Sequence, residues 1–244
     1  MNFYAVIIGT EILNGRRVDK HFAFLQTELA KYGHTLFASF TIKDDKELMK
    51  RTYNMIKNDA NAVMFSFGGI GATPDDLTRE IASEIFRESK VVTNAQFKQD
   101  IIDRFAEDAY PYRIHMADLP PNAELLKNPV NNMSGFALDK RYFFVPGFPS
   151  MAHPMICEVI KKYFSQKKES YRYTLLAKTS ENTLISIMEQ IPSHIELSSL
   201  PIFIDNMPNV ELSLSGEKRE DVLDYFKLFE EKLNEKNIPY TILQ

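Results

Sequence analysis

Residues 66–78 have the sequence SFGGIGATPDDLT. The apolar run before them, residues 62–65, is typical of a buried strand, and Leu77, Ile81 and Ile85 recur at the spacing of one helix face. Three of the chain's nine glycines fall within four positions here, and glycine lets a backbone approach an anion closely. Because a helix start adds unpaired N–H groups and a positive dipole end, this order of strand, glycine turn and helix predicts a phosphate site.

Two carboxylates, Asp75 and Asp76, directly follow the glycines and would repel a phosphate. A divalent cation between them and the phosphate would remove this conflict, because both groups are its usual ligands. A second interpretation needs no ligand: Thr73 as N-cap, Pro74 at the first helical position and Asp76 as the capping-box acid together satisfy the rules for a helix start. That interpretation leaves the three glycines without an explanation.

The composition is ordinary for a globular protein. The 244 residues, 44% hydrophobic and 25% charged, predict one or two domains with a sizeable core. The net charge of −4 gives no general attraction to nucleic acid or to an acidic membrane. Cys157 is the single cysteine, and the sequence shows neither a signal peptide nor an apolar run long enough to span a membrane. We therefore expect a cytoplasmic protein without nucleic-acid or membrane partners.

Strands alternate with helices over the first two thirds of the chain, which predicts an α/β sandwich with a largely parallel sheet. Ligands of such sheets bind at the carboxyl ends of the strands. Gly9-Thr10-Glu11 and Gly68-Gly69 each follow a strand, so we expect them to share one edge. The expected strands cover residues 4–8, 35–42, 62–65, 135–138 and 142–145, and the expected helices cover 22–32, 44 or 45 to 57, a segment beginning at 75, 94–106 and a segment ending at about 164.

A polar segment, residues 165–170, is the expected linker and divides the chain into domains of residues 1–168 and 169–244. The second domain combines an alternating strand with a helix that carries an apolar stripe, which predicts a small α+β module. Its pattern suits a KH-like fold. However, Gly216 is its only glycine, so the GXXG loop with which KH domains clamp nucleic acid cannot form.

Other common motifs do not fit. No Gly-Lys-Ser/Thr follows the glycines, which excludes a Walker A loop, and Pro74 occupies the third glycine position of the dinucleotide fingerprint. The five histidines form no zinc pattern. We expect His21, which lies near the glycine site in the sequence, to be structural or solvent-facing.

Four segments, in this order, resemble the MoaB/Mog molybdopterin-binding domain family, and within it the amino-terminal part of CinA-type competence/damage-inducible proteins. Together they span about residues 4–165. The order of all four is specific, whereas a single glycine run would be weak. They are Ile8-Gly9-Thr10-Glu11-Ile12-Leu13-Asn14-Gly15, Thr41-Ile42-Lys43-Asp44-Asp45, the glycine segment from Gly68 to Thr78, and Pro146-Gly147-Phe148-Pro149-Ser150-Met151.

The resemblance implies a three-layer αβα MoaB/Mog-like sandwich followed by a small KH-like domain. It implies metal-dependent hydrolysis of ADP-ribose-like pyrophosphates with Mg²⁺, Mn²⁺ or Co²⁺, or alternatively binding or adenylylation of molybdopterin. It also implies a homo-oligomer, a dimer or trimer. The deamidase domain that follows in CinA-type proteins is not expected in this chain.

The resemblance also assigns roles to residues, each beside a structural alternative such as a turn or a helix cap. Asp76 and Asp75 would be catalytic, and Asp76, Asp44 and Glu11 would bind the metal. The expected ligand-binding residues are Gly68, Gly69, Gly71, Thr73, Gly9, Thr10, Asn14, Pro146 and Gly147. The chain departs from the family's pattern at Ala72, Lys20, His21, Phe148 and Ser150, which affects catalysis more than fold.

Overall fold

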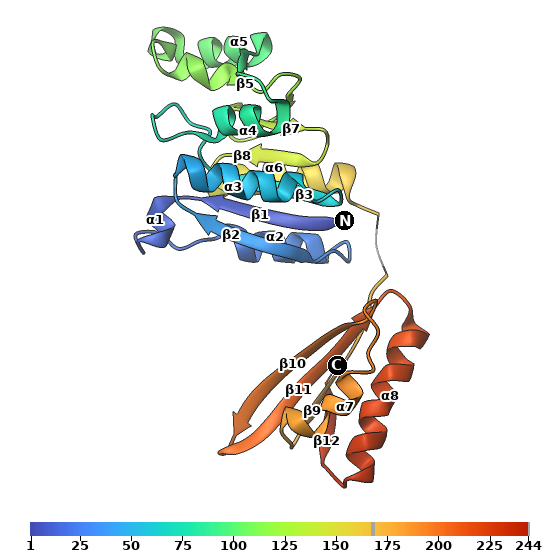
Figure 1. The fold of residues 1–244 in the computed structure, drawn as a ribbon. Coiled ribbons are helices and arrows are strands. Elements are labelled where there is room, and N and C mark those ends of the chain that lie inside the picture. Colours follow the sequence, from blue (N-terminus) through green and yellow to red (C-terminus); the bar gives the residue numbers. More distant parts are fainter. Residues whose placement is uncertain (167–168, 244) are drawn as a thin grey trace. The chain divides into compact units, whose positions relative to one another are not determined.

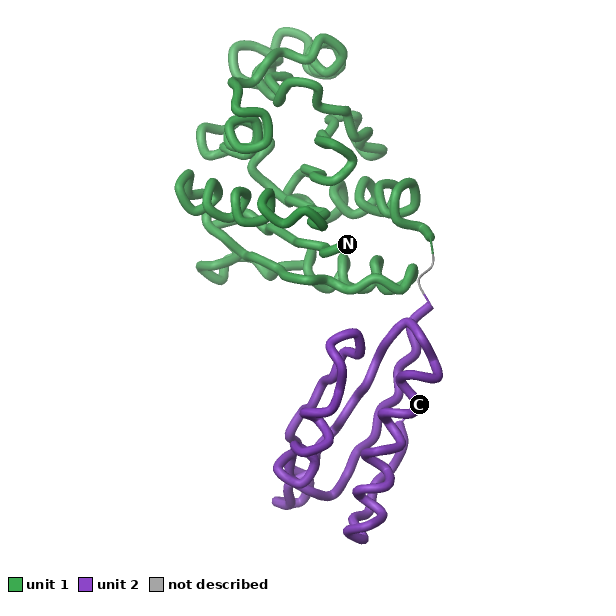
Figure 2. The backbone as a smooth tube through the Cα atoms, turned by 45° about the vertical axis from the view of Figure 1, so that its right-hand side comes forward, with its two compact units in different colours: residues 1–167 green, residues 168–244 purple. Residues whose placement is uncertain are grey.

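The computed structural model describes residues 1–166 and 169–243 of the chain. The chain divides into two compact units, residues 1–167 and residues 168–244 (Figure 2). Lys167 and Lys168, in the middle of the expected linker, lie outside the described residues.

The first unit is built on a six-stranded sheet (Figure 1). Its strand order is β2-β1-β3-β8-β7-β6, in which the first four strands pair in parallel and the last two pair antiparallel. The strands are β1 (Asn2–Ile8), β2 (Leu36–Ile42), β3 (Ala62–Phe67), β6 (Glu124–Leu126), β7 (Gly135–Leu138) and β8 (Tyr142–Val145). The predicted mostly parallel sheet is therefore confirmed.

Helices cover both faces of this sheet. The side chains of β1 therefore point alternately into two buried cores, one on each face. Tyr4, Val6 and Ile8 belong to one buried cluster with α3 (Lys46–Lys57), α4 (Thr78–Arg87) and α5 (Ala95–Phe105). The residues between them belong to a second cluster with α2 (His21–Ala30) and α6 (Pro149–Tyr163). This arrangement is the expected three-layer αβα sandwich.

Short elements complete the first unit. The segment after α5 was expected to be mostly loop, and it contains only brief pieces of regular structure that pack beside that helix. The short elements are α1 (Thr10–Leu13) and β4 (Val92–Thr93) before α5, and η1 (Ala106–Ala109), η2 (Arg113–Ala117) and β5 (Asp118–Leu119) after it.

The start of α4 differs from the prediction. The helix begins at Thr78, three residues later than expected, and Leu77 occupies the N-cap position without a side-chain cap. Thr73 is therefore not the helix cap, and Pro74 is not in the first helical turn. Instead, Asp76 accepts the backbone N–H of Thr73 at 2.8 Å, and this bond closes a separate turn before the helix. At α3 the alternatives resolve to Asp45, whose side chain caps the N–H of Leu48.

The second unit is an α+β module, as predicted. Its four strands pair antiparallel in the order β10-β11-β9-β12, and the apolar stripe of α8 packs into the core of the unit. Its elements are β9 (Tyr171–Ala177), η3 (Glu181–Thr183), α7 (Ile185–Met188), β10 (Glu196–Ile204), β11 (Met207–Gly216), α8 (Arg219–Glu235) and β12 (Tyr240–Leu243). Across the described parts of both units, we find no helix with the length and hydrophobicity that a membrane crossing requires.

Candidate functional site

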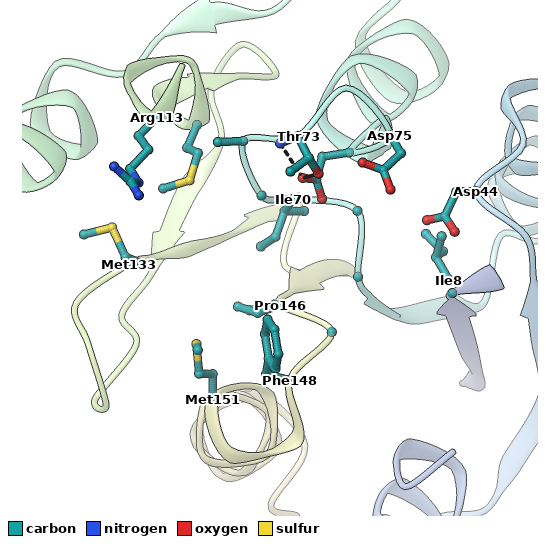
Figure 3. Close-up of a pocket in the computed structure, with 18 of the residues that line it drawn as sticks. Ile8, Asp44, Ile70, Thr73, Asp75, Arg113, Met133, Pro146, Phe148 and Met151 are labelled. Atoms are coloured by element: carbon teal, nitrogen blue, oxygen red, sulfur yellow. Dashed lines mark hydrogen bonds between the residues drawn. The ribbon is translucent and has the colours of Figure 1, made fainter. Parts of the chain in front are cut away.

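A pocket of about 560 Å³ lies at the carboxyl ends of β1, β3 and β8 (Figure 3). This volume is within the usual range for small-molecule sites. The two predicted loops after β1 and β3 meet here, as expected for one sheet edge. Of the residues that were predicted from the sequence, the wall contains Gly9, Glu11, Asp44, Gly68, Gly69, Gly71, Thr73, Asp75, Asp76, Pro146 and Gly147.

The glycine turn is shaped by contacts within the protein. Gly68 and Gly69 have φ angles of 100° and 68°, which side chains other than glycine rarely adopt. A Cβ at Gly69 would lie 2.3 Å from Thr78 Oγ1, and one at Gly71 would lie 2.5 Å from Asp76 Oδ2. The sequence alone offered no structural explanation for the three glycines, and these contacts supply one.

The carbonyl groups of the turn are bound by the start of α4. The backbone N–H of Thr78 donates to Gly69 O and its hydroxyl to Gly68 O, both at 3.0 Å. The buried guanidinium of Arg79 donates to Ile70 O. With the carbonyls held in this way, the N–H groups of four consecutive residues, 69–72, have no hydrogen-bond acceptor anywhere in the described parts of the chain. Such a row of backbone donors can bind an anion.

Four carboxylates lie in the same wall: Glu11, Asp44, Asp75 and Asp76. Asp76 accepts both the N–H and the hydroxyl of Thr73 through its Oδ2 atom. The nearby Thr73 side chain, and after it the backbone N–H of Asp75 itself, lower the pKa of the Asp75 carboxyl. This end of the pocket is therefore acidic beside the row of amides, and a phosphate placed at these amides would meet the conflict expected from the sequence.

Asp44 binds the turn that follows β1. The backbone N–H and the hydroxyl of Thr10 both donate to Asp44 Oδ2 at 2.9 Å. Thr10 itself is outside the pocket wall, and so is Asn14, whose side chain instead accepts from Arg16 at the surface. The structure thus places these two of the predicted ligand-binding residues behind or beside the pocket.

The donor set suits a cation that is shared with a ligand. Asp44 and Asp76 each use Oδ2 for protein hydrogen bonds, and their Oδ1 atoms have no hydrogen-bond donor among the residues that the structure describes. Within residues 1–166 and 169–243, no three His, Cys, Asp or Glu side chains are grouped closely enough to hold a metal ion. Mg²⁺ commonly binds one or two carboxylates together with phosphate oxygens, and these residues fit that mode rather than a cage made by protein alone.

A histidine pair supports the opposite wall. His21 is 3% exposed, stacks on Phe67, and its Nε2 lies 3.2 Å from Gly147 O. Since a carbonyl accepts, His21 Nε2 carries the proton and Nδ1 accepts from His153 Nε2 at 3.3 Å. Burial is the main cause that lowers the pKa of both imidazoles. His21 is therefore structural, which was one of the two expected roles.

Two arginines in the wall were missed from the sequence. The guanidinium carbon of Arg113 lies 4.7 Å from the ring centre of Phe105, and that of Arg17 lies 5.7 Å from the ring centre of Phe148. Neither arginine belongs to a motif or a periodic pattern. The segment around Arg113 looked like loop in the sequence, so no local signal marked it.

Together, the mostly parallel αβα sandwich and the glycine turn at its strand ends define an α/β small-molecule-binding domain. Residues 4–166 match the family described as "Probable molybdopterin binding domain", and the chain belongs to this family.

Individual relatives agree with this assignment. A CinA-like protein of Nostoc punctiforme is 32% identical over 162 residues, which cover 64% of this chain and 38% of that protein. A protein of Archaeoglobus fulgidus is 23% identical over 239 residues, 97% of this chain and all of that protein. Among solved structures, CinA of Thermoplasma acidophilum, described as of unknown function, is 25% identical with a TM-score of 0.59, and the match covers 66% of this chain and 96% of that one. The chain spans about two fifths of the length of the CinA-like relatives first matched.

Proposed function

We propose that this chain binds a nucleotide of the ADP-ribose type at the glycine turn and hydrolyses its pyrophosphate bond with a divalent cation. The observation that carries the proposal is the row of four backbone N–H groups, residues 69–72, that have no acceptor among the described residues and lie beside four carboxylates in one pocket. Amides of this kind bind phosphate oxygens, and the carboxylates provide oxygen ligands for a cation. The family description, a probable molybdopterin binding domain, supports a phosphorylated small molecule as the ligand.

The chain's own residues have separate tasks in this reaction. The amides of residues 69–72 orient the pyrophosphate, and Asp75 or Asp76 accepts a proton from the attacking water. Water adds to one phosphorus, the P–O–P bond breaks, and AMP and ribose 5-phosphate are released. Asp44, Asp76 and Glu11 would hold the cation, which would neutralise charge on the phosphates.

Turnover is tested by incubating the chain with ADP-ribose and Mg²⁺, Mn²⁺ or Co²⁺ and measuring AMP by chromatography. We expect AMP release that is lost in Asp76→Asn and Asp44→Asn. Asp100→Asn is the matched control, because Asp100 is on α5 outside the pocket and its side chain accepts a hydrogen bond from Gln96. Absence of AMP with every cation would contradict the proposal.

A second candidate is a binder of molybdopterin or nucleotide without hydrolysis, or with transfer of an adenylyl group to molybdopterin. It is favoured by the engagement of Asp76 and Asp44 with Thr73 and Thr10, since a carboxylate that ties down a loop needs no catalytic role. Saturable binding of a pterin phosphate or a nucleotide, with no AMP release under any cation, would select this candidate. ATP-dependent product formation would select adenylyl transfer.

The remaining expectations belong to the same proposal. We infer a cytoplasmic protein that forms a dimer or trimer and acts on small molecules rather than on nucleic acid or membranes. Size-exclusion chromatography with light scattering tests the oligomeric state.

A further inference from the structure

The pocket has two chemically different ends. In Figure 3, Asp44 and Asp75 lie on one side, Arg113 and Met133 lie on the other, and Ile70 and Thr73 lie between them. The acidic end and the glycine amides account for a phosphate and a cation. The opposite end has no role in that chemistry, so it must be explained by another part of the ligand.

Arg113 is held in a fixed position at this second end. Its guanidinium carbon lies over the Phe105 ring at 4.7 Å, and its Nη1 donates to Asp108 O at 2.8 Å. Within the described residues it makes no ion pair with a carboxylate. The side chain is nevertheless exposed and lines the pocket. A planar cation that is anchored on one aromatic face leaves its other face for a second flat group.

Apolar side chains surround this plane. Met116 and Met133 line the pocket with Arg113, and so does Phe97, which is 3% exposed. Thioethers are polarizable and adapt to the edges of aromatic rings. A phosphate or a sugar gains little from such neighbours, whereas a flat heteroaromatic ring gains contact with all of them.

We propose that Arg113, on its Phe105 support and in one wall with Met116 and Met133, is the ring-binding platform of this pocket. It takes the flat heteroaromatic ring, a purine or a pterin, of the ligand whose phosphate is bound by the glycine turn. The inference rests on the proposed function, because it uses the same pocket. Arg113 is a specificity-determining residue: it selects phosphorylated ligands that carry a ring over those that do not.

The experiment compares a ligand that has a ring with one that lacks it. Dissociation constants of ADP-ribose and ribose 5-phosphate are measured by calorimetry for the wild-type chain, Arg113→Ala and Arg113→Lys. Stacking of a base on a side chain strengthens binding by a factor of about ten or more. We therefore expect Arg113→Ala to raise the dissociation constant of ADP-ribose about tenfold. Ribose 5-phosphate should bind unchanged. Arg113→Lys should behave like the alanine variant, because a lysine keeps the charge but not the plane.

Arg104→Ala is the matched control. Arg104 approaches the same Phe105 ring at 5.4 Å, but it is outside the pocket wall. Its removal should leave both affinities unchanged. A phosphorylated pterin in place of ADP-ribose extends the test, and a loss in Arg113→Ala with either ring supports the platform.

Three results would overturn the platform. The first is that Arg113→Ala lowers the affinity for ADP-ribose and for ribose 5-phosphate equally. The second is that it lowers neither affinity, and the third is that Arg104→Ala lowers the affinity for ADP-ribose as much as Arg113→Ala does. If the wild-type chain binds neither ligand, both proposals fail. If it binds both ligands and Arg113→Ala changes neither affinity, the glycine-turn proposal stands and only the platform fails.

Discussion

The carboxylate of Asp76 accepts both the hydroxyl and the backbone N–H of Thr73, at 2.6 and 2.8 Å. This pair closes the turn that carries the acidic end of the pocket, and it lies before the helix rather than inside it. One residue pair therefore holds the loop and also contributes to the candidate site.

Removal of the Thr73 hydroxyl should separate these roles. We expect Thr73→Ala to lower the free energy of unfolding by about 1 kcal/mol, the usual worth of such a hydrogen bond, in urea denaturation. Thr93→Ala is the control, because its hydroxyl makes the same bond to Asp118 at 2.6 Å, outside the pocket wall. The two variants should lose similar stability, and only Thr73→Ala should weaken ADP-ribose binding. Equal ligand affinity in both would show that Thr73 serves the fold alone.

Gly69 should tolerate no side chain. In Gly69→Ala the new Cβ would meet Thr78 Oγ1 at 2.3 Å in a backbone with positive φ, so we expect a loss of about 2 kcal/mol in the free energy of unfolding. Gly15→Ala is the matched variant, since Gly15 also has a positive φ of 77°, but a Cβ at this position would meet no atom within 4 Å. Gly15→Ala should lose only the free energy that a positive φ costs a residue other than glycine, about 1 kcal/mol. Urea unfolding of both variants gives the difference, and no difference would mean that Thr78 moves aside without cost.

A fall in pH should lower the stability of the folded chain through the histidine pair His21 and His153, which supports the pocket wall. Burial lowers the pKa of His21 in the folded chain below its ordinary value of 6.5, so the unfolded chain binds more protons between these two values. The stability that neutral His21 contributes is therefore complete above about pH 6.5 and is lost as the pH falls through the folded pKa. His21→Gln should show a shallower decline in melting temperature between pH 7 and pH 5 than the wild-type chain.

His153 is the comparison in that experiment. Burial and the neighbouring His21 lower the pKa of its imidazole as well, but the ring is less buried. His153→Gln should therefore reduce the pH dependence less than His21→Gln does. Identical pH profiles for wild type and His21→Gln would show that His21 does not titrate in this range.

Much of the fold could be predicted because its signals are local. The hairpin strands β7 and β8 have the predicted bounds, since a continuous apolar run flanks the turn at Asp139-Lys140 on each side. The shared edge of Gly9 and Gly68 followed from the rule for parallel strands, and a Cβ at Gly68 would indeed lie 2.6 Å from Ile8 O.

The parts that could not be predicted depend on distant contacts. Capping rules made Thr73 the N-cap of a helix that begins at Asp75, but the carbonyls of Gly68 and Gly69 fix the start of α4 at Thr78, and no local rule includes that pairing. Arg113 begins the short helix η2 and Met133 lies in a loop, and neither segment has a periodic sequence, so only the folded chain shows that they share a wall.

Arg79 is buried and also hydrogen-bonds the glycine turn, so its replacement should lower both the stability of the fold and the affinity for a ligand. It is 9% exposed, its guanidinium donates to Ile70 O, and burial is the main cause that lowers its pKa. Arg79→Met fills similar space but leaves that carbonyl without its donor, so we expect a loss of about 2 kcal/mol in the free energy of unfolding. Because the Ile70 carbonyl fixes the direction of the neighbouring amides, the affinity for ribose 5-phosphate should fall as well. Arg51→Met, at an exposed position of α3, should change neither quantity. A destabilised Arg79→Met that still binds ribose 5-phosphate like the wild type would show that the turn keeps its shape without this arginine.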